Sequence, residues 1–219
     1  MREWEVLHED EDIIVCYKPA GLATQNAKSM EPDLVSLLRN YRKEKGEDTY
    51  IGVIQRLDQP VEGVLCFGKT KEATENLTKQ LREHKITKKY YAIITRGNLP
   101  REATLEDYLV KDGRKGRAMV VPADDPRAKK ARLSYRVISE VDDMRLLDIS
   151  LETGRFHQIR TQLASRTAPI YGDVKYGGVS TGRPLCLCAY QSRFLHPKTG
   201  QPLEYTINPK GEDFADLLP

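Results

Sequence analysis

The sequence has no apolar run that approaches the length of a transmembrane helix, and its N-terminus, Met1-Arg2-Glu3-Trp4-Glu5, lacks the apolar core of a signal peptide. Only four of the 219 residues are cysteine, and a chain of this length can bury a core without disulfides. One close cysteine pair, Cys186 and Cys188, falls short of the four ligands of a structural zinc site. These absences predict a soluble, cytoplasmic protein without a metal, a cofactor or a membrane contact.

The sequence also lacks an excess of one charge. Its 35 Lys and Arg residues against 32 Asp and Glu residues give a net charge of +3, so an anionic partner has to be met by a local patch. Residues 111–136 contain such a concentration, with nine cations and three acids. This stretch is either the footprint of a phosphate backbone or a solvated, mobile basic loop.

Apolar periodicity predicts more strands than helices. Helices are expected after Asp33, ending near Gly46, after Thr70, and from about His157. Strands are expected at 13–17, 64–67, 90–95, 132–138, 145–151 and 203–207. Since strands and helices do not alternate strictly, the pattern favours an α+β fold with an antiparallel or mixed sheet and flanking helices. No repeat or long linker divides the chain, so residues 1–219 are predicted to form a single domain.

The tripeptide Arg56-Leu57-Asp58 places a guanidinium two residues from a carboxylate on one side of an extended segment. A cation nearby keeps a carboxylate ionised, and an ionised carboxylate in a cleft can act as a nucleophile or a base. The same spacing also occurs in structural ion pairs at strand ends. The tripeptide alone leaves both interpretations open.

Two further segments carry polar chemistry. In Gly154-Arg155-Phe156-His157-Gln158-Ile159-Arg160, the two arginines can donate to a phosphate or to a carboxylate such as Asp58. His157 is either a general base or a structural hydrogen-bonding residue at the start of a helix. In Lys88-Lys89-Tyr90-Tyr91-Ala92, the adjacent tyrosines point to opposite faces of a strand, so only one of them can face a given cleft.

Together with several other motifs, these segments resemble the ordered signature of the RluA-type pseudouridine synthases. The motifs are Lys18-Pro19-Ala20-Gly21, Arg56-Leu57-Asp58 with Gly63 and Lys69-Thr70, Lys88-x-Tyr90-x-Ala92, the segment from Gly154 to Ala164, Gly172-Asp173, and His196-Pro197-x-Thr199-Gly200. They follow one another in the right order over nearly the whole chain, which makes the resemblance much more specific than any one motif.

The resemblance implies a fold and a reaction. It predicts a long, bent mixed sheet, mainly antiparallel, with flanking helices, and the conversion of uridine to pseudouridine in structured ribosomal or transfer RNA. This isomerisation involves no net redox change, and the sequence shows no nucleotide-binding loop, metal cluster or cofactor lysine. No room precedes Trp4 for the S4-like RNA-binding domain of some relatives, so a catalytic domain alone is expected. The protein is also expected to be a monomer.

The resemblance also assigns roles to residues. Asp58 corresponds to the catalytic aspartate, Tyr90 to the active-site tyrosine and Arg160 to the basic partner of Asp58. The predicted substrate-binding residues are Arg56, Arg155, His157, Gln158, Leu185 and Leu187, where Arg56 fills the space left by a flipped uridine and the two leucines form the apolar wall under the uracil. Independently of the resemblance, the basic stretch 111–136 supplies Lys129, Lys130 and Arg132 as the predicted contacts to the RNA backbone.

The chain departs from the family pattern at three places. Gln55 stands where His is usual, Val61-Glu62 replaces a pair of small hydroxyl residues, and Cys188 stands where His is common. These departures bear on substrate choice or rate more than on reaction class. Two rival functions remain: a noncatalytic RNA-binding protein that kept the fold, and a nucleosidase or glycosidase in which Glu62 is the second acid beside Asp58.

Overall fold

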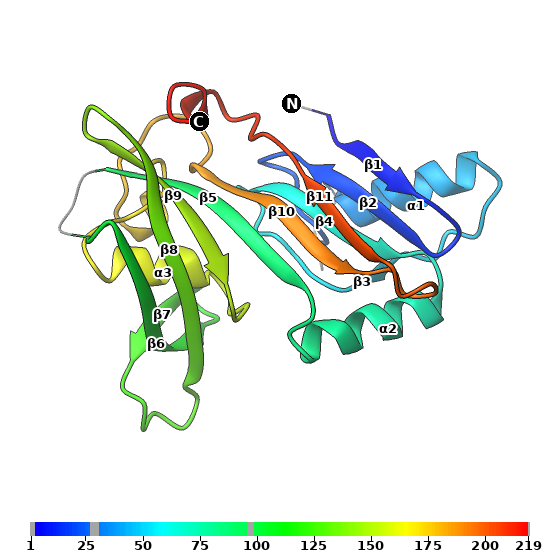
Figure 1. Cartoon of the computed structure of the whole chain (residues 1–219), viewed down its shortest axis with the longest axis horizontal. Helices are drawn as coiled ribbons and strands as arrows, with labels where there is room; N and C mark the ends of the chain where they lie inside the picture. Colours follow the sequence, from blue (N-terminus) through cyan, green and yellow to red (C-terminus); the bar gives the residue numbers. More distant parts are fainter. Residues whose placement is uncertain (1–2, 27–30, 96–98, 219) are drawn as a thin grey trace. The chain divides into compact units, whose positions relative to one another are not determined.

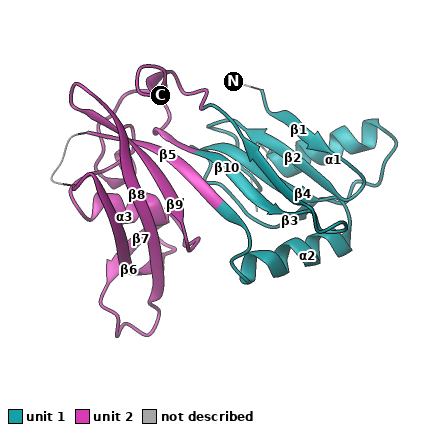
Figure 2. Cartoon of the chain, in the orientation of Figure 1, with its two compact units in different colours: residues 1–87, 189–208 teal, residues 88–188, 209–219 magenta. Residues whose placement is uncertain are grey.

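A computed structural model of the chain describes residues 3–26, 31–95 and 99–218 (Figure 1). The chain divides into two compact units (Figure 2). Unit 1 comprises residues Met1–Thr87 and Ala189–Asn208, and unit 2 comprises Lys88–Cys188 and Pro209–Pro219. No helix within the described residues has both the length and the apolar character needed to span a bilayer.

Unit 1 is built on strands that alternate between early and late parts of the chain. The strands are β1 (Glu5–Glu9), β2 (Ile13–Lys18), β3 (Gly52–Val53), β4 (Glu62–Gly68), β10 (Leu187–Leu195) and β11 (Pro202–Thr206). Their order is β1–β2–β4–β10, with β3 paired to β4 and β11 paired to β10. The antiparallel register of β2 and β4 sets Lys18 opposite Gly63 and Tyr17 opposite Val64. This pairing fixes the end of β2 to the start of β4, and these are the two strand ends that face the loop containing Asp58.

The two helices of unit 1 begin where their capping residues predict. The Asp33 carboxylate accepts a hydrogen bond from the Ser36 amide at the start of α1 (Leu34–Glu44), and the Thr70 hydroxyl accepts one from the Ala73 amide at the start of α2 (Lys71–Arg82). The apolar side of α2 packs into a buried cluster that contains Ile13, Val15, Val64, Leu77 and Phe194. Burial of these side chains holds the helix on the sheet.

Unit 2 is an antiparallel ladder with one short helix. Its strands are β5 (Thr87–Thr95), β6 (Glu102–Asp112), β7 (Arg117–Val121), β8 (Lys129–Val141) and β9 (Met144–Leu151), in the order β5–β9–β8–β6–β7. Every pair in this ladder is antiparallel. Helix α3 (Gln158–Ala164) contacts β6 and β7, and most of its residues are buried.

The predicted α+β class with a mixed, mainly antiparallel sheet is confirmed. Strands β1, β3, β6, β7 and β10 are absent from the predicted strands, and the idea that residues 111–136 form one mobile loop is wrong, because the end of β6, all of β7 and the first part of β8 lie in that stretch. Strand β6 was missed because its apolar residues are separated by charged ones. Leu105 and Leu109 of β6 are buried, whereas charged residues such as Glu102 and Glu106 face solvent, so the strand shows no continuous apolar run.

Candidate active site

Asp58 lies in unit 1, in an irregular segment between β3 and β4, and is half-buried. Its carbonyl accepts a hydrogen bond of 3.0 Å from the Val61 amide, which closes a turn immediately before β4 begins at Glu62. Its neighbour Leu57 is buried, whereas Arg56 is exposed. The buried leucine anchors the segment and leaves the arginine at the surface.

The loop that follows β2 clamps this segment on both sides of Asp58. The Thr24 hydroxyl accepts a hydrogen bond from the Leu57 amide (3.1 Å) and donates one to the Leu57 carbonyl (2.9 Å). Gly21 donates its amide to the Gln59 carbonyl (2.9 Å) and accepts from the Gln59 side chain (3.1 Å). Gly21 has φ +91°, a conformation that favours glycine. These contacts fix the backbone of the residues before and after Asp58.

Lys18 supplies the charged centre of this clamp. Its fully buried ammonium donates to the carbonyls of Pro19 (3.0 Å), Leu22 (2.6 Å) and Gln59 (3.2 Å). Burial lowers the pKa of Lys18 to about 7, although the charges of Asp58 and Glu62 raise it. Lys18 was part of a family motif in the sequence, but nothing in its local pattern predicted that it joins two loops.

Glu62 occupies the place where the family has a small hydroxyl residue. It is 5% exposed, and its carboxylate accepts a hydrogen bond of 2.7 Å from the Tyr17 hydroxyl. The next residue, Gly63, has φ +146°, and a Cβ atom there would lie 2.5 Å from the Cβ atom and the carbonyl oxygen of Ala189. The close approach of β4 and β10 therefore requires glycine at this position.

Gln55, another departure from the family pattern, is half-buried beside this segment. Its Nε2 atom is shielded from solvent and has no hydrogen-bond partner among the residues that the structure describes. A buried amide donor without an acceptor costs free energy in the folded state. Nothing in the structure explains why this chain has Gln at this position.

Unit 2 carries the other two predicted catalytic residues. Tyr90 lies on β5 opposite Ile149 of β9 and is 5% exposed, whereas Tyr91 lies opposite Asp148 and is half-buried. The predicted alternation of the two tyrosines is confirmed. The role of Tyr90 in a reaction stays a prediction.

Arg160, on α3, forms a buried bidentate ion pair with Asp173. Its Nε and Nη2 atoms donate to the two carboxylate oxygens at 2.7 and 2.8 Å, and the side chains are 5% and 1% exposed. Its Nη1 atom lies 3.2 Å from Nε2 of His157. Arginine can only donate, so Nε2 must accept this hydrogen bond and the imidazole proton must be on Nδ1. The Asp173 carboxylate therefore orients Arg160. The pairing of Arg160 with Asp58 stays a prediction.

The side chain of His157 makes hydrogen bonds within the fold through both ring nitrogens. It precedes α3 with φ +53°, and its Nδ1 atom lies 2.9 Å from the Tyr176 hydroxyl, which also accepts from the Ala118 amide. Burial and the charge of Arg160 lower the pKa of His157 to about 3. A neutral ring with both nitrogens engaged fits the structural interpretation of His157 better than that of a general base.

Gln158 and Arg155 also make contacts within unit 2. The Gln158 carbonyl oxygen accepts from the Thr153 hydroxyl and the Arg155 amide, while its amide nitrogen donates to the Arg132 carbonyl and to Gln162. The exposed Arg155 side chain donates to the Lys130 carbonyl at 2.8 Å. A substrate contact of these two residues stays a prediction.

The remaining predicted site residues divide into buried and exposed groups. Leu185 and Leu187 are 6% and 4% exposed, in keeping with an apolar wall. Lys130 and Arg132 are exposed but paired: Lys130 lies 2.8 Å from Glu106, and Arg132 contacts Glu106 and Glu152. These carboxylates offset much of the positive charge that the sequence assigned to this part of β8.

Among the described residues the four cysteines form no disulfide: Cys16, Cys186 and Cys188 are buried, and Cys66 is half-buried. Burial raises the pKa of the Cys16 thiol well above its usual value. Cys186 lies 3.7 Å from the carboxylate of Asp213.

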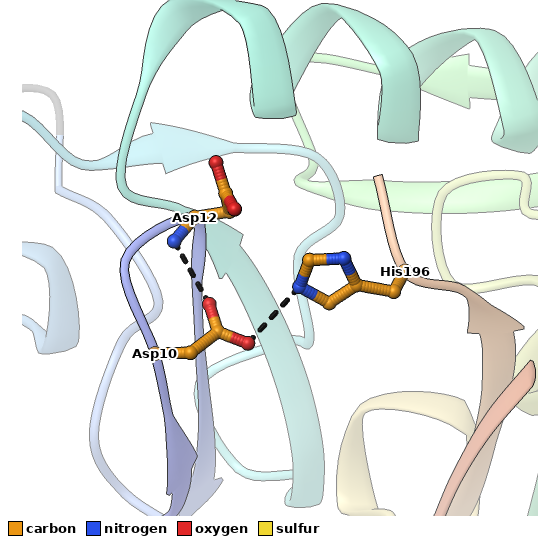
Figure 3. A group of neighbouring side chains, drawn as sticks. All are labelled: Asp10, Asp12 and His196. Carbon is orange, nitrogen blue, oxygen red and sulfur yellow. Dashed lines mark hydrogen bonds and ion pairs between the residues drawn. The ribbon is translucent and has the colours of Figure 1, made fainter. Parts of the chain in front are cut away.

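One group of possible metal ligands occurs among the described residues: Asp10, Asp12 and His196, whose ligand atoms lie within 4.8 Å of one another (Figure 3). Nδ1 of His196 accepts hydrogen bonds from the amides of Lys198 and Thr199, so Nε2 carries the proton and donates to Asp10 at 3.0 Å. Neither nitrogen has a lone pair left for an ion. The group instead joins the turn after β1 to the turn after β10.

Comparisons with known proteins place the chain in a family. The family model for RNA pseudouridylate synthase matches residues 12–165. The chain is 31% identical over 225 residues to the ribosomal large subunit pseudouridine synthase D of Nitrosomonas europaea, covering 98% of this chain and 64% of that protein. It is also 31% identical over 219 residues to the tRNA pseudouridine synthase C of Salmonella typhimurium, covering 91% of this chain and 83% of that protein.

A solved structure supports the same fold. The human RNA pseudouridylate synthase domain containing 4 superposes with a TM-score of 0.75 and 24% sequence identity, covering 94% of this chain and 88% of that chain. Since the family model matches residues 12–165, which is more than half of the chain, the chain belongs to the RNA pseudouridylate synthase family.

Proposed function

We propose that this chain isomerises uridine to pseudouridine in RNA and that Asp58 is the essential carboxylate. The observation that carries the proposal is the family match over residues 12–165, a range that includes Asp58. The clamp from Gly21 and Thr24 supports it, because a carboxylate held by its fixed backbone can be positioned without reorganisation during the reaction.

The reaction breaks the bond from C1′ to N1, turns the uracil and rejoins it through C5. It needs a carboxylate near the ribose, a group that handles the C5 proton and a pocket that accepts a base removed from its stack. We assign these roles to Asp58, to Tyr90 and to the apolar side chains Leu185 and Leu187. Asp58 either attacks C1′ or removes the 2′ proton of the ribose. Arg56, exposed at the edge of the Asp58 turn, is the proposed residue that replaces the flipped base.

The substrate proposal rests on the relatives. The chain spans 64% of the Nitrosomonas europaea relative, which is named for the large ribosomal subunit, and 83% of the Salmonella typhimurium relative, which is named for tRNA. We therefore propose ribosomal or transfer RNA as the substrate class. A single catalytic domain over residues 1–219, a cytoplasmic monomer and activity without a cofactor stay predictions.

The variant Asp58→Asn tests the proposed function. It is nearly isosteric but can act neither as a nucleophile nor as an anionic base, so tritium release from RNA labelled at uridine C5 should fall by roughly 10³-fold or more. Asp124→Asn, which changes an exposed aspartate in unit 2, is the matched control and should retain full activity. Both variants should keep the thermal unfolding profile of the wild type.

The same assay separates the rival functions. Tritium release and pseudouridine formation by a folded Asp58→Asn protein would contradict the role of Asp58. Wild-type protein that binds RNA without releasing tritium would be a noncatalytic RNA-binding protein. Free uracil as the product would show a nucleosidase, and loss of that product in Glu62→Gln would identify Glu62 as its second acid.

A further inference from the structure

Unit 2 presents a surface on which cations lie over aromatic rings. The ammonium of Lys111 lies 4.5 Å from the centre of the Phe156 ring, and the guanidinium of Arg117 lies 5.1 Å from the centre of the Tyr176 ring. Lys175, next to Tyr176, donates to the Gly116 carbonyl at 3.3 Å. We call these five residues, Lys111, Arg117, Phe156, Lys175 and Tyr176, the cation–aromatic face.

Hydrogen bonds and ring stacking hold residues of this face in place. The antiparallel register of β6 and β7 sets Lys111 opposite Ala118, whose amide donates to the Tyr176 hydroxyl at 2.7 Å. The Phe156 ring stacks on His157 at 3.8 Å between centroids, with an interplanar angle of 19°. One side of the phenyl ring is thus covered by imidazole, and Lys111 lies over the ring as its cationic neighbour.

No carboxylate of the described residues forms an ion pair with the cations of this face, although Asp112 lies opposite Arg117 in the register of β6 and β7. In the part of the chain that the structure describes, Lys111, Arg117 and Lys175 form no ion pair, and all three are exposed. One oxygen of the nearby Asp112 accepts the amides of Arg114 and Lys115 in the hairpin turn. This is the reverse of the Lys130 and Arg132 region, where Glu106 and Glu152 lie within ion-pair distance.

Burial lowers the pKa of His157 most, the charges of Arg160, Lys175 and Lys111 lower it further, and the charge of Asp173 raises it. Since His157 stays neutral, the ring under Phe156 adds aromatic surface without adding another charge. Exposed cations beside aromatic rings suit single-stranded RNA, because the cations can contact phosphates and the rings provide a flat surface on which a base can stack.

We propose that the cation–aromatic face binds a single-stranded segment of the substrate RNA, with phosphates at Lys111, Arg117 and Lys175 and one unstacked base on Phe156. In this arrangement the Lys111 ammonium moves from the ring to a phosphate, and the base takes its place. The proposal rests on the proposed function, because it takes RNA as the partner, but it assigns a surface that the reaction itself does not require.

Binding of oligoadenylate tests the face without engaging the active site, since this RNA offers phosphates and bases but no uridine. The triple variant Lys111→Ala/Arg117→Ala/Lys175→Ala should bind a fluorescein-labelled oligoadenylate more weakly. It should also lower the log–log salt slope by about two, because each contact to single-stranded RNA releases roughly 0.7 counterions. Phe156→Leu should weaken binding about tenfold and leave the slope unchanged, since it removes stacking and no charge.

Two controls keep the test specific. The variant Lys111→Arg/Arg117→Lys/Lys175→Arg conserves the charge and should retain the salt slope, which excludes misfolding as the cause. The triple variant Lys129→Ala/Lys130→Ala/Arg132→Ala should change the slope by less than one, because Lys130 and Arg132 are already paired with Glu106 and Glu152.

Each outcome decides a separate question. If the Lys111 triple variant binds as the wild type does at every salt concentration, the proposed surface is wrong. If Phe156→Leu has no effect and a polyglutamate peptide competes as well as RNA of equal charge, the face is an acidic-protein surface and the RNA proposal is overturned. Tritium release by the wild type tests the reaction independently, so a wild type without activity but with the predicted salt behaviour would overturn the proposed function alone.

Discussion

The Asp58 segment of unit 1 and the Arg160 segment of unit 2 hold their charged groups in two different ways. Asp58 is positioned through its backbone: Thr24, Gly21 and Lys18 contact the residues before and after it. Arg160 is positioned through its side chain, by the two oxygens of Asp173. The position of Asp58 therefore depends on an intact loop, whereas the position of Arg160 depends on its pairing with one buried carboxylate.

The two segments also differ in whether a neighbouring group titrates near neutral pH. Burial lowers the pKa of Lys18 to about 7, so the clamp beside Asp58 contains a group that titrates near neutrality. The pKa of His157, beside Arg160, is lowered to about 3, and arginine stays charged throughout. The loop that carries Asp58 is therefore sensitive to pH in the neutral range, and the surroundings of Arg160 are not.

The largest expected effect comes from Asp173→Asn. It removes the carboxylate charge opposite the buried Arg160, and breaking a buried ion pair typically costs about 3 to 5 kcal/mol of unfolding free energy. Urea denaturation is the measurement. The control is Asp213→Asn, in which the pair with Arg183 is more exposed, at 54% and 19% for Arg183 and Asp213, and the cost should stay below about 1 kcal/mol. Similar costs for the two variants would break the distinction between buried and exposed pairs.

Lys18→Met should show the pH sensitivity of the clamp. The unfolded chain keeps the Lys18 proton up to its ordinary range, whereas the folded state releases it near pH 7, where its pKa lies. Between these values the unfolded state binds more protons, so the wild type gains stability as pH rises. The difference in unfolding free energy between wild type and Lys18→Met should grow by about 2 kcal/mol from pH 7 to pH 9.

The corresponding difference for Asp173→Asn should stay constant over the same range, since arginine remains charged and His157 remains neutral. Urea denaturation of the three proteins at several pH values measures both trends. The contrast between the two segments would be wrong if the difference in unfolding free energy stayed constant with pH for Lys18→Met. It would also be wrong if that difference changed with pH for Asp173→Asn.

A smaller effect is expected at the turn after β1. Burial would raise the pKa of Asp10, but hydrogen bonds from the Ile13 amide, His8, the Asp12 amide and His196 lower it to about 2. The stability that this lowered pKa contributes is present above the ordinary aspartate range and is lost as pH falls toward 2. Since the side chain is 32% exposed, Asp10→Asn should cost about 1 kcal/mol at pH 7.

The cost of Asp10→Asn should shrink as denaturation is repeated at progressively lower pH between 5 and 2. Asp12→Asn is the control: its carboxylate lies 3.9 Å from the exposed Lys198, and its loss should change stability by less than about 0.5 kcal/mol. An Asp10→Asn penalty that is unchanged at pH 2 would show that the lowered pKa does not stabilise this turn.

Local sequence patterns predicted the elements whose signals are short-range. Asp33 and Thr70 marked the starts of α1 and α2, and the apolar run after Asp12 marked β2. Strand β6, which lies between β8 and β7, was missed because its apolar residues alternate with charged ones, and β7 was missed because this edge strand has only five residues. Helix α3 was predicted, but its burial was not, because Gln158, Arg160 and Gln162 are buried polar residues that only their partners satisfy.

The candidate site was predictable as motifs and not as contacts. Lys18 and Asp173 lay in family motifs, yet no local pattern indicated that Lys18 donates to the Gln59 carbonyl or that Arg160 donates to Asp173, because these pairs are 41 and 13 residues apart. The Lys129, Lys130 and Arg132 patch was chosen from charge density. Its pairing with Glu106 and Glu152 depends on the register of β8 with β6 and the residues after β9, which composition does not reveal.

The order in which the strands occur along the chain has a consequence for biosynthesis. A ribosome completes β1, β2 and β4 early, but β10, which lies beside β4, emerges only after β5 to β9 have all been made. The ladder of unit 2 is continuous in sequence and can pair as it emerges, whereas one edge of β4 stays open in the nascent chain. Gly63 meets Ala189 only at the end of this process. The sheet of unit 1, beside which Asp58 lies, therefore begins with the first strand of the chain and receives its last strands, β10 and β11, only after the ladder of unit 2 has been made.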